Sequence, residues 1–163
     1  MATDTVDTSK LWDLIKDIKF AMFTARHGNG HLHSRPMTTQ NGDSDRGAVL
    51  WFFMSRKSDP VADLQAAPEV NVAYADPGRD AYVSVSGTAR VVEDDARKQA
   101  LFNTFAKAWF PGGASDPDLA LVDVNLAGTE SFPVADALRE RGIPFLFTTG
   151  YGQHGLPERF ADT

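Results

Sequence analysis

The stretch FAMFTARHGNGHLHSRPMTTQ, residues 20–40, contains two β-like runs joined by one turn. The runs cover residues 20–26 and 31–40, and Gly28-Asn29-Gly30 lies between them. An Asn-Gly pair in this position is the strongest short-range hairpin signal, because both residues tolerate a positive φ. The stretch therefore predicts a pair of antiparallel strands.

Further β-like runs follow this hairpin along the chain. Residues 49–54 are almost continuously apolar, and the runs 70–75 and 81–92 flank the turn Asp76-Pro77-Gly78-Arg79. Short strands separated by turn residues are typical of all-β barrels and sandwiches. We therefore predict an antiparallel meander that forms a small barrel.

Three helices are expected around these strands. The first begins at residue 7 or 8, where a capping residue precedes apolar residues with helical spacing. A short second helix is expected at about residues 58–68. The third begins at Asp94 and runs as one long helix to Pro111. The apolar face of this third helix consists of Leu101, Phe102, Phe105 and Trp109.

The pattern of the chain changes at Leu119. The runs 119–126 and 145–149 are apolar without alternation, which is typical of strands buried on both faces. A short helix is expected between them, so this part has the strand–helix–strand order of an α/β fold. We therefore expect residues 1–122 to form the barrel domain and residues 123–163 to form a short α/β-like segment, incomplete as a domain.

The composition excludes several classes of protein. The 163 residues include 16 Lys and Arg and 22 Asp and Glu, which gives a net charge of −6. This acidic balance provides no electrostatic basis for binding nucleic acid or an anionic membrane. No apolar run approaches the roughly 18 residues of a membrane span, and the polar, acidic start does not resemble a secretory signal. We therefore expect a cytoplasmic protein.

The most informative polar cluster combines Arg35, on one β-like run, with Ser55-Arg56-Lys57 at the end of another. Proteins bind a phosphate group with Arg or Lys together with hydroxyl and backbone donors. The aromatic run Trp51-Phe52-Phe53 offers the dry, flat wall that a flavin ring requires. The cluster favours a site for flavin mononucleotide (FMN), although charges at strand ends are commonly solvated without any ligand.

Several motifs in chain order resemble one family. They are Ser34–Gln40, Trp51–Phe53, Ser55–Lys57, Ser86–Ala89, Ala108–Pro111 and Asp116-Pro117. Over about residues 11–121 the chain resembles the general stress protein branch of the pyridoxamine 5′-phosphate oxidase-like, FMN-binding split barrels. The resemblance implies a mainly β fold, an antiparallel split β-barrel with flanking helices. It also implies a homodimer with FMN in the cleft between the protomers, and residues 119–126 must then supply the last strand.

The same resemblance assigns roles to individual residues, all written here as expectations. Those implied for the phosphate and ribityl chain are Arg35, Ser55, Arg56 and Lys57. Those implied for the ring are Met37, Thr38, Gln40, Phe52, Phe53 and Trp109, the last as a wall from the end of a helix. FMN is the expected cofactor, and FAD is a second option.

Three functions are compatible with the sequence. The first is a flavin-dependent oxidoreductase acting on an unidentified small-molecule substrate or reductant. Oxidation of pyridoxamine phosphate itself is not expected, because nothing matches the C-terminal Arg/His element of the true oxidases. The second is a non-catalytic flavin-binding stress or sensor protein. The third is a haem or metal binder that uses His27, His31 and His33, which lie along one hairpin.

The tail resembles a different family. Residues from about 116 to 163 are similar to the later part of a response-regulator receiver domain. In that comparison Asp123 stands at the phospho-acceptor position, and Thr148 or Thr149 stands near the hydroxyl that contacts the phosphoryl group. The early acidic pair that binds Mg²⁺ and the Lys of the last strand have no counterpart. Phosphoryl transfer depends on both, so a working phosphorylation site is not expected.

Overall fold

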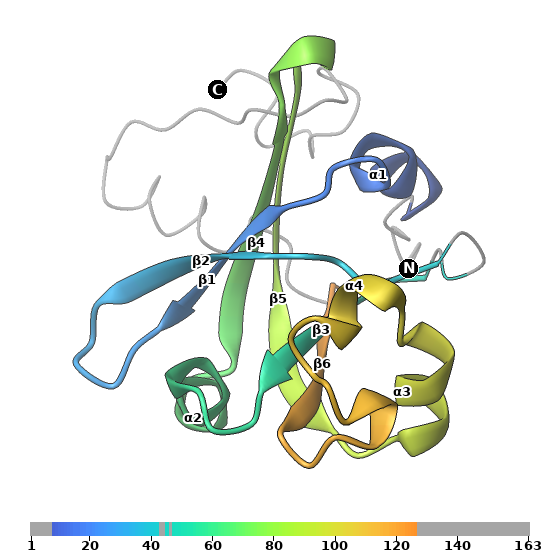
Figure 1. The fold of residues 1–163 in the computed structure, drawn as a ribbon. Helices are drawn as coiled ribbons and strands as arrows, with labels where there is room; N and C mark the ends of the chain where they lie inside the picture. The colour runs from blue at the N-terminus through green and yellow to red at the C-terminus, as the bar shows by residue number, and fades with distance from the viewer. Residues whose placement is uncertain (1–7, 43–44, 46, 127–163) are drawn as a thin grey trace, which may run out of the picture. The chain divides into compact units, whose positions relative to one another are not determined.

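The computed structural model describes residues 8–42, 45 and 47–126, and Figure 1 shows their arrangement. The helices are α1 (Thr8–Ile15), α2 (Asp59–Ala66), α3 (Asp95–Leu101) and α4 (Thr104–Lys107), with short 3₁₀ turns η1 (Pro77–Arg79) and η2 (Gly113–Ser115). The strands are β1 (Ala21–Arg26), β2 (Leu32–Met37), β3 (Val49–Ser55), β4 (Glu69–Asp76), β5 (Ala81–Val92) and β6 (Leu119–Asn125). Within these residues no helix has the length and apolar character that crossing a membrane requires.

The six strands form one sheet in the order β2-β1-β4-β5-β6-β3, with every neighbouring pair antiparallel. This confirms the predicted antiparallel split barrel with flanking helices. The two predicted hairpins, β1–β2 and β4–β5, are also confirmed. The predicted meander is wrong for β3, which among the described strands pairs with β6 alone, far along the chain. Consecutive strands β2 and β3 therefore lie at opposite edges of the curled sheet.

Strand β6 completes the sheet as the resemblance required. It pairs with β3 from Ser55↔Leu119 to Val49↔Asn125, and with β5 on its other side. Six of its seven residues are buried, which explains the apolar run without alternation. The expected boundary between residues 122 and 123 falls within this strand, and the compact unit that contains it spans Met1–Thr129. The expected helix and strand of the tail lie outside the described residues.

Asp123, the residue that the receiver resemblance placed at the phospho-acceptor position, lies within β6. Its side chain is 4% exposed, and both carboxylate oxygens accept hydrogen bonds from Arg90 Nε, at 2.9 and 3.1 Å. Arg90 is its cross-strand partner on β5. The carboxylate therefore forms an ion pair with its neighbouring strand, and Thr148 and Thr149 lie outside the described residues.

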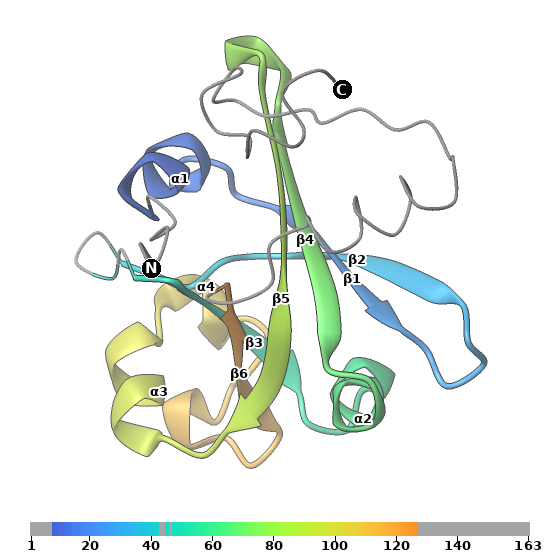
Figure 2. The ribbon, with the colours of Figure 1, turned by 180° about the vertical axis from the view of Figure 1, so that it is seen from behind.

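Two apolar clusters hold the sheet and helices together. The larger one fills the curled sheet, where the rings of Phe23 and Phe52 meet edge to face at 5.3 Å. Its helix members are Trp12 and Ile15 from α1 and Val61 and Leu64 from α2. The smaller cluster packs α3 and α4 against β3 and β6, and both ribbon views show these elements grouped together (Figures 1 and 2). Phe52 and Phe53, adjacent on β3, enter different clusters because side chains alternate along a strand.

The long third helix predicted from Asp94 is two helices. Helix α3 ends at Leu101, and Phe102 has an extended backbone with φ −66° and ψ 132°. The Asn103 side chain then caps α4 by accepting a hydrogen bond from the Ala106 amide at 3.0 Å. Asn is a favoured N-cap residue, because its side-chain oxygen can accept a hydrogen bond from a backbone amide in the first turn of a helix. The cap at Asn103 therefore begins a new helix, although the apolar pattern continues through it.

Candidate functional site

A cavity of about 380 Å³ opens where the two edges of the sheet approach each other. The amide of Gln40, just after β2, donates to the carbonyl of Trp51 on β3 at 2.8 Å, which links these two edges. Helices α2 and α4 supply further walls. The lining residues are Phe20, Phe23, Arg35, Pro36, Met37, Thr38, Gln40, Phe53, Met54, Ser55, Ser58, Pro60, Phe105, Ala106, Trp109, Phe110 and Asp118.

Seven of the ten sequence-predicted site residues line this cavity. They are Arg35, Met37, Thr38, Gln40, Phe53, Ser55 and Trp109. They come from β2 and the segment after it, from β3, and from the end of α4, so the fold brings together residues up to 74 positions apart (109 − 35). The structure thus gathers most of the predicted set at one place.

The other three predicted residues do not line the cavity. Phe52 is fully buried in the larger apolar cluster. Both terminal nitrogens of Arg56 donate to the Glu93 carboxylate, at 2.7 and 3.2 Å, and this contact is the main reason that the Glu93 pKa is lowered. Lys57 is exposed and does not belong to the lining.

The described residues that line the cavity include one cation and one carboxylate, on Arg35 and Asp118. Asp118 accepts a hydrogen bond from the Ser55 hydroxyl at 2.7 Å and another from the Lys57 amide at 3.3 Å. The hydrogen bond from Ser55 is the main reason that the Asp118 pKa lies below its usual value. The carboxylate is therefore ionised at neutral pH.

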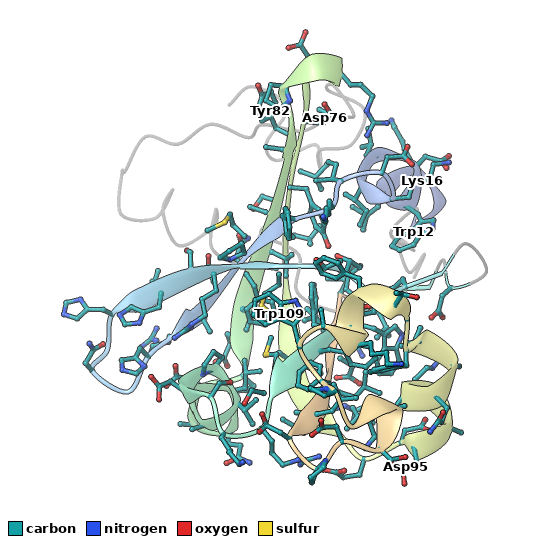
Figure 3. The ribbon with its side chains drawn as sticks, viewed as in Figure 1. Trp12, Lys16, Asp76, Tyr82, Asp95 and Trp109 are labelled. Carbon is teal, nitrogen blue, oxygen red and sulfur yellow. The ribbon has the colours of Figure 1, made fainter. Side chains whose placement is uncertain are left out.

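Three aromatic residues of the lining are exposed. Trp109 is 73% exposed, Phe20 53% and Phe105 41%, although all three line the cavity. Figure 3 shows Trp109 at the end of α4 and near the centre of the view, whereas exposed Tyr82 lies at the far end of the β4–β5 hairpin. The ammonium of Lys19 lies 5.1 Å from the Phe20 ring centroid and 4.8 Å from that of Phe105. Exposed aromatic groups of this size mark a surface for a ligand or a partner.

The side chain of Gln40 is held at both of its polar atoms. Its Nε2 donates to the Thr38 carbonyl at 3.0 Å, and its Oε1 accepts from Asn103 Nδ2 at 2.9 Å. Because Asn103 also caps α4, this contact connects the segment after β2 to the helix that carries Phe105. Such a network preorganises a lining group before any ligand arrives.

Thr39, between two lining residues, is tied to the barrel interior. Its hydroxyl and the Tyr74 hydroxyl lie 2.7 Å apart. Burial raises the pKa of Tyr74 to about 12, while the hydrogen bond with Thr39 acts in the opposite direction. The Tyr74 hydroxyl therefore stays protonated at any physiological pH.

This buried hydroxyl makes stability depend on alkaline pH. An unfolded Tyr titrates near pH 10, so the folded pKa is the higher one and the stabilisation is complete below about pH 10. We expect the free energy of unfolding to fall by about 2–3 kcal/mol as pH rises from about 10 to 12. Urea titrations of the wild type and of Tyr74→Phe test this, because the variant lacks the titrating group. Parallel pH curves for the two proteins would contradict the assignment.

Sequence reasoning missed several lining residues. Phe20 begins a predicted strand and Phe105 lies on the apolar face of a predicted helix, but no local pattern places these two rings at one cavity. Ser58 contacts Ser55 within its own turn, whereas the contact of Asp118 with Ser55 joins segments that are distant in sequence. The residue types of Asp116-Pro117-Asp118 indicate a turn, which is a signal for a loop at Asp118 but not for its contact with Ser55.

Two of the three predicted haem or metal ligands, His27 and His33, lie beside each other, and His27 contacts Asp63 of α2. His27 Nδ1 lies 3.0 and 3.1 Å from the two carboxylate oxygens of Asp63, and this hydrogen bond is the main cause of the lowered Asp63 pKa. The His33 ring stacks on that of His27 at 4.6 Å. Over the described ranges, no three His, Asp or Glu side chains are grouped so that they could hold a metal ion. Within the described residues the histidine cluster therefore does not form a multidentate metal site.

Comparison with known proteins identifies relatives of this chain. Protein bli-3 of Neurospora crassa is 31% identical over 117 residues, which are 66% of this chain and 56% of bli-3. The chain thus spans just over half the length of that relative. The crystal structure of a general stress FMN/FAD binding protein from Xanthomonas citri matches with a TM-score of 0.65 at 32% identity, over 76% of this chain and 85% of that one.

A second crystal structure, of a putative general stress family protein from Xanthomonas campestris, is 28% identical with a TM-score of 0.63, and the match covers 93% of this chain and all of that one. The family described as pyridoxamine 5′-phosphate oxidase like matches residues 6–135. This range includes the first 20 residues (116–135) of the tail that resembles a receiver domain, and it contains the whole of β6. The chain therefore belongs to the pyridoxamine 5′-phosphate oxidase-like family.

Proposed function

We propose that this protein binds FMN in the cavity between the sheet edges and acts as a flavin-dependent oxidoreductase on a small molecule. The observation that carries the proposal is the composition of one cavity. Its lining includes Arg35 together with Ser55 and Ser58, and the remaining lining residues are mostly apolar and aromatic. A general stress FMN/FAD binding protein with the same fold adds support.

The chemistry of the lining fits a flavin monophosphate. The aromatic and aliphatic walls suit a flat ring that must be kept from water, and Arg35 suits a phosphate group. Of the described residues that line the cavity, Arg35 is the one cation, which favours the single phosphate of FMN over the diphosphate of FAD. When bound, a flavin supplies hydride-transfer and one-electron chemistry, and the protein supplies orientation and electrostatics.

Titration of the purified chain with FMN and with riboflavin tests the binding part of the proposal. We expect quenching of flavin fluorescence by the wild type, and Arg35→Ala should weaken FMN binding by about 1–3 kcal/mol, because it removes a charge-assisted hydrogen bond. Riboflavin binding should change little, because riboflavin has no phosphate. Arg26→Ala is the matched control, since Arg26 is an exposed arginine of β1 outside this cavity. Unquenched fluorescence with the wild type would refute the proposal.

Turnover tests the catalytic part. Loaded protein should oxidise NAD(P)H or another small reductant in the presence of an electron acceptor. Saturated flavin without turnover across a wide panel of donors would instead support the non-catalytic stress or sensor protein.

We also propose that the functional unit is a homodimer, with the flavin between the protomers. The exposed rings of Phe20, Phe105 and Trp109 leave the mouth of the cavity apolar and open, and a second copy would cover them. Light scattering should give the mass of two chains. A single-chain mass for protein that still binds FMN tightly would contradict the dimer.

A further inference from the structure

Asp118 contacts every residue of the turn that the sequence singles out for phosphate binding. Its carboxylate accepts from the Ser55 hydroxyl at 2.7 Å and from the Lys57 amide at 3.3 Å. Its backbone carbonyl accepts from the Arg56 amide at 2.6 Å. Ser55-Arg56-Lys57 is thus bound by one acidic residue that itself lines the cavity.

Two further polar side chains in and beside this turn, those of Ser58 and Arg56, also have partners. The Ser58 hydroxyl and amide both donate to the Ser55 carbonyl, at 2.6 and 3.0 Å. The Arg56 guanidinium donates to Glu93 with two nitrogens. Because a hydroxyl has one proton to donate, Ser55 presents only acceptor capacity to the cavity while it is bound to Asp118. Three side-chain donors in and beside this turn, the Ser55 and Ser58 hydroxyls and the Arg56 guanidinium, are therefore engaged by groups of the protein itself.

The position of Asp118 is fixed by the loop that precedes β6. Its amide donates to the Asp116 side chain at 2.9 Å, and the other oxygen of that carboxylate accepts from the Gly112 amide at 3.0 Å. The next residue, Leu119, is paired with Ser55 in the sheet. Asp118 is therefore held beside the turn by both the loop and the strand register, and its contacts there do not depend on a ligand.

We propose that Asp118 is a specificity-determining residue of the flavin site: its carboxylate occupies the donors of the Ser55–Lys57 turn and so lowers the affinity for the phosphate of FMN. The inference rests on the proposed flavin site. A fixed negative charge in the cavity opposes a phosphate dianion, and neighbouring groups of the protein must release Ser55 before it can donate to a ligand. Riboflavin has no phosphate group, so neither the negative charge of Asp118 nor the engagement of Ser55 lowers its affinity. Asp118 thus reduces the preference of the site for FMN over riboflavin.

The test is the ratio of the affinities for FMN and riboflavin, measured by fluorescence quenching on the full chain. Asp118→Asn removes the charge and keeps the shape, and Asp118→Ala also releases the Ser55 hydroxyl. We expect FMN to bind about tenfold more tightly to both variants at low salt, with riboflavin unchanged and the gain smaller at high salt. Asp95→Asn, which removes an exposed charge on α3, controls for the change in net charge and should leave the ratio unchanged.

The possible results distinguish a failure of the role proposed for Asp118 from a failure of the proposed flavin site. If the wild type binds both flavins and the variants bind FMN equally or more weakly, Asp118 instead holds the turn in its binding conformation, and the specificity role is overturned. A parallel change in both affinities, or a loss of native circular dichroism in both variants, overturns it as well. If neither flavin binds to the wild type or to any variant, the proposed flavin site itself fails and this inference fails with it.

Discussion

Phe52→Ala should lower the free energy of unfolding by about 3–5 kcal/mol, the range for removing a large side chain from a packed core. Phe52 has no exposed surface, and its ring meets that of Phe23 edge to face at 5.3 Å. It lies on β3 opposite Val122 of β6, and its side chain belongs to the larger apolar cluster. The cavity that alanine leaves cannot collapse easily, because β3 is held by its pairing with β6 and the rest of the cluster is closely packed. Urea unfolding of the two proteins measures the difference.

Phe105→Ala is the matched control, since it deletes the same side chain from a position that is 41% exposed and lines the cavity. It should cost less than about 1 kcal/mol of stability while weakening flavin binding. Phe52→Leu keeps most of the core volume and provides folded protein for the binding assay. If Phe52→Leu binds FMN much more weakly than the wild type, Phe52 contacts the ring as the resemblance implied, and its placement in the core is incomplete.

Local patterns were sufficient to predict the two hairpins. The turn Gly28-Asn29-Gly30 predicted β1 and β2 correctly, because hairpin geometry depends on a few adjacent residues. The position of β3 could not be predicted in the same way. Its only partner among the described strands is β6, and the pairing Ser55↔Leu119 joins residues 64 positions apart (119 − 55). Periodicity showed that both strands are buried, but burial does not identify a neighbour.

The hydrogen-bond and ion-pair partners of surface side chains could not be predicted from the sequence either. The family resemblance implies a phosphate role for Arg56, but in the structure Arg56 pairs with Glu93, which directly follows β5. The contact between Asp118 and Ser55 depends on the register between β3 and β6. The ion pairs and hydrogen bonds around the cavity therefore depend on contacts between distant segments, which local sequence patterns do not show.

Gly87→Val is the second substitution expected to have a large effect, at about 3 kcal/mol of lost stability, the upper end of what overpacking costs. In the sequence Gly87 is only one member of the alternation Ser84 to Thr88. In the structure it is buried where β5 passes β6, and a Cβ there would lie 2.6 Å from the Asn125 carbonyl oxygen and 2.9 Å from Val124 Cγ1. The nearest atom is backbone, so it cannot rotate away as a side chain could, and the two strands would have to separate.

Gly28→Ala is the control for the loss of a glycine, because a Cβ at Gly28 has no atom within 4 Å. It should be neutral or add up to about 1 kcal/mol, since alanine restricts the unfolded chain more than glycine does. Because β6 also supplies the register that brings Asp118 to Ser55, separating β5 from β6 should disturb the cavity as well as the core. Denaturant midpoints together with FMN titration measure both effects. Wild-type stability in Gly87→Val would mean that β5 and β6 have room between them, and the tight crossing of these strands would be wrong.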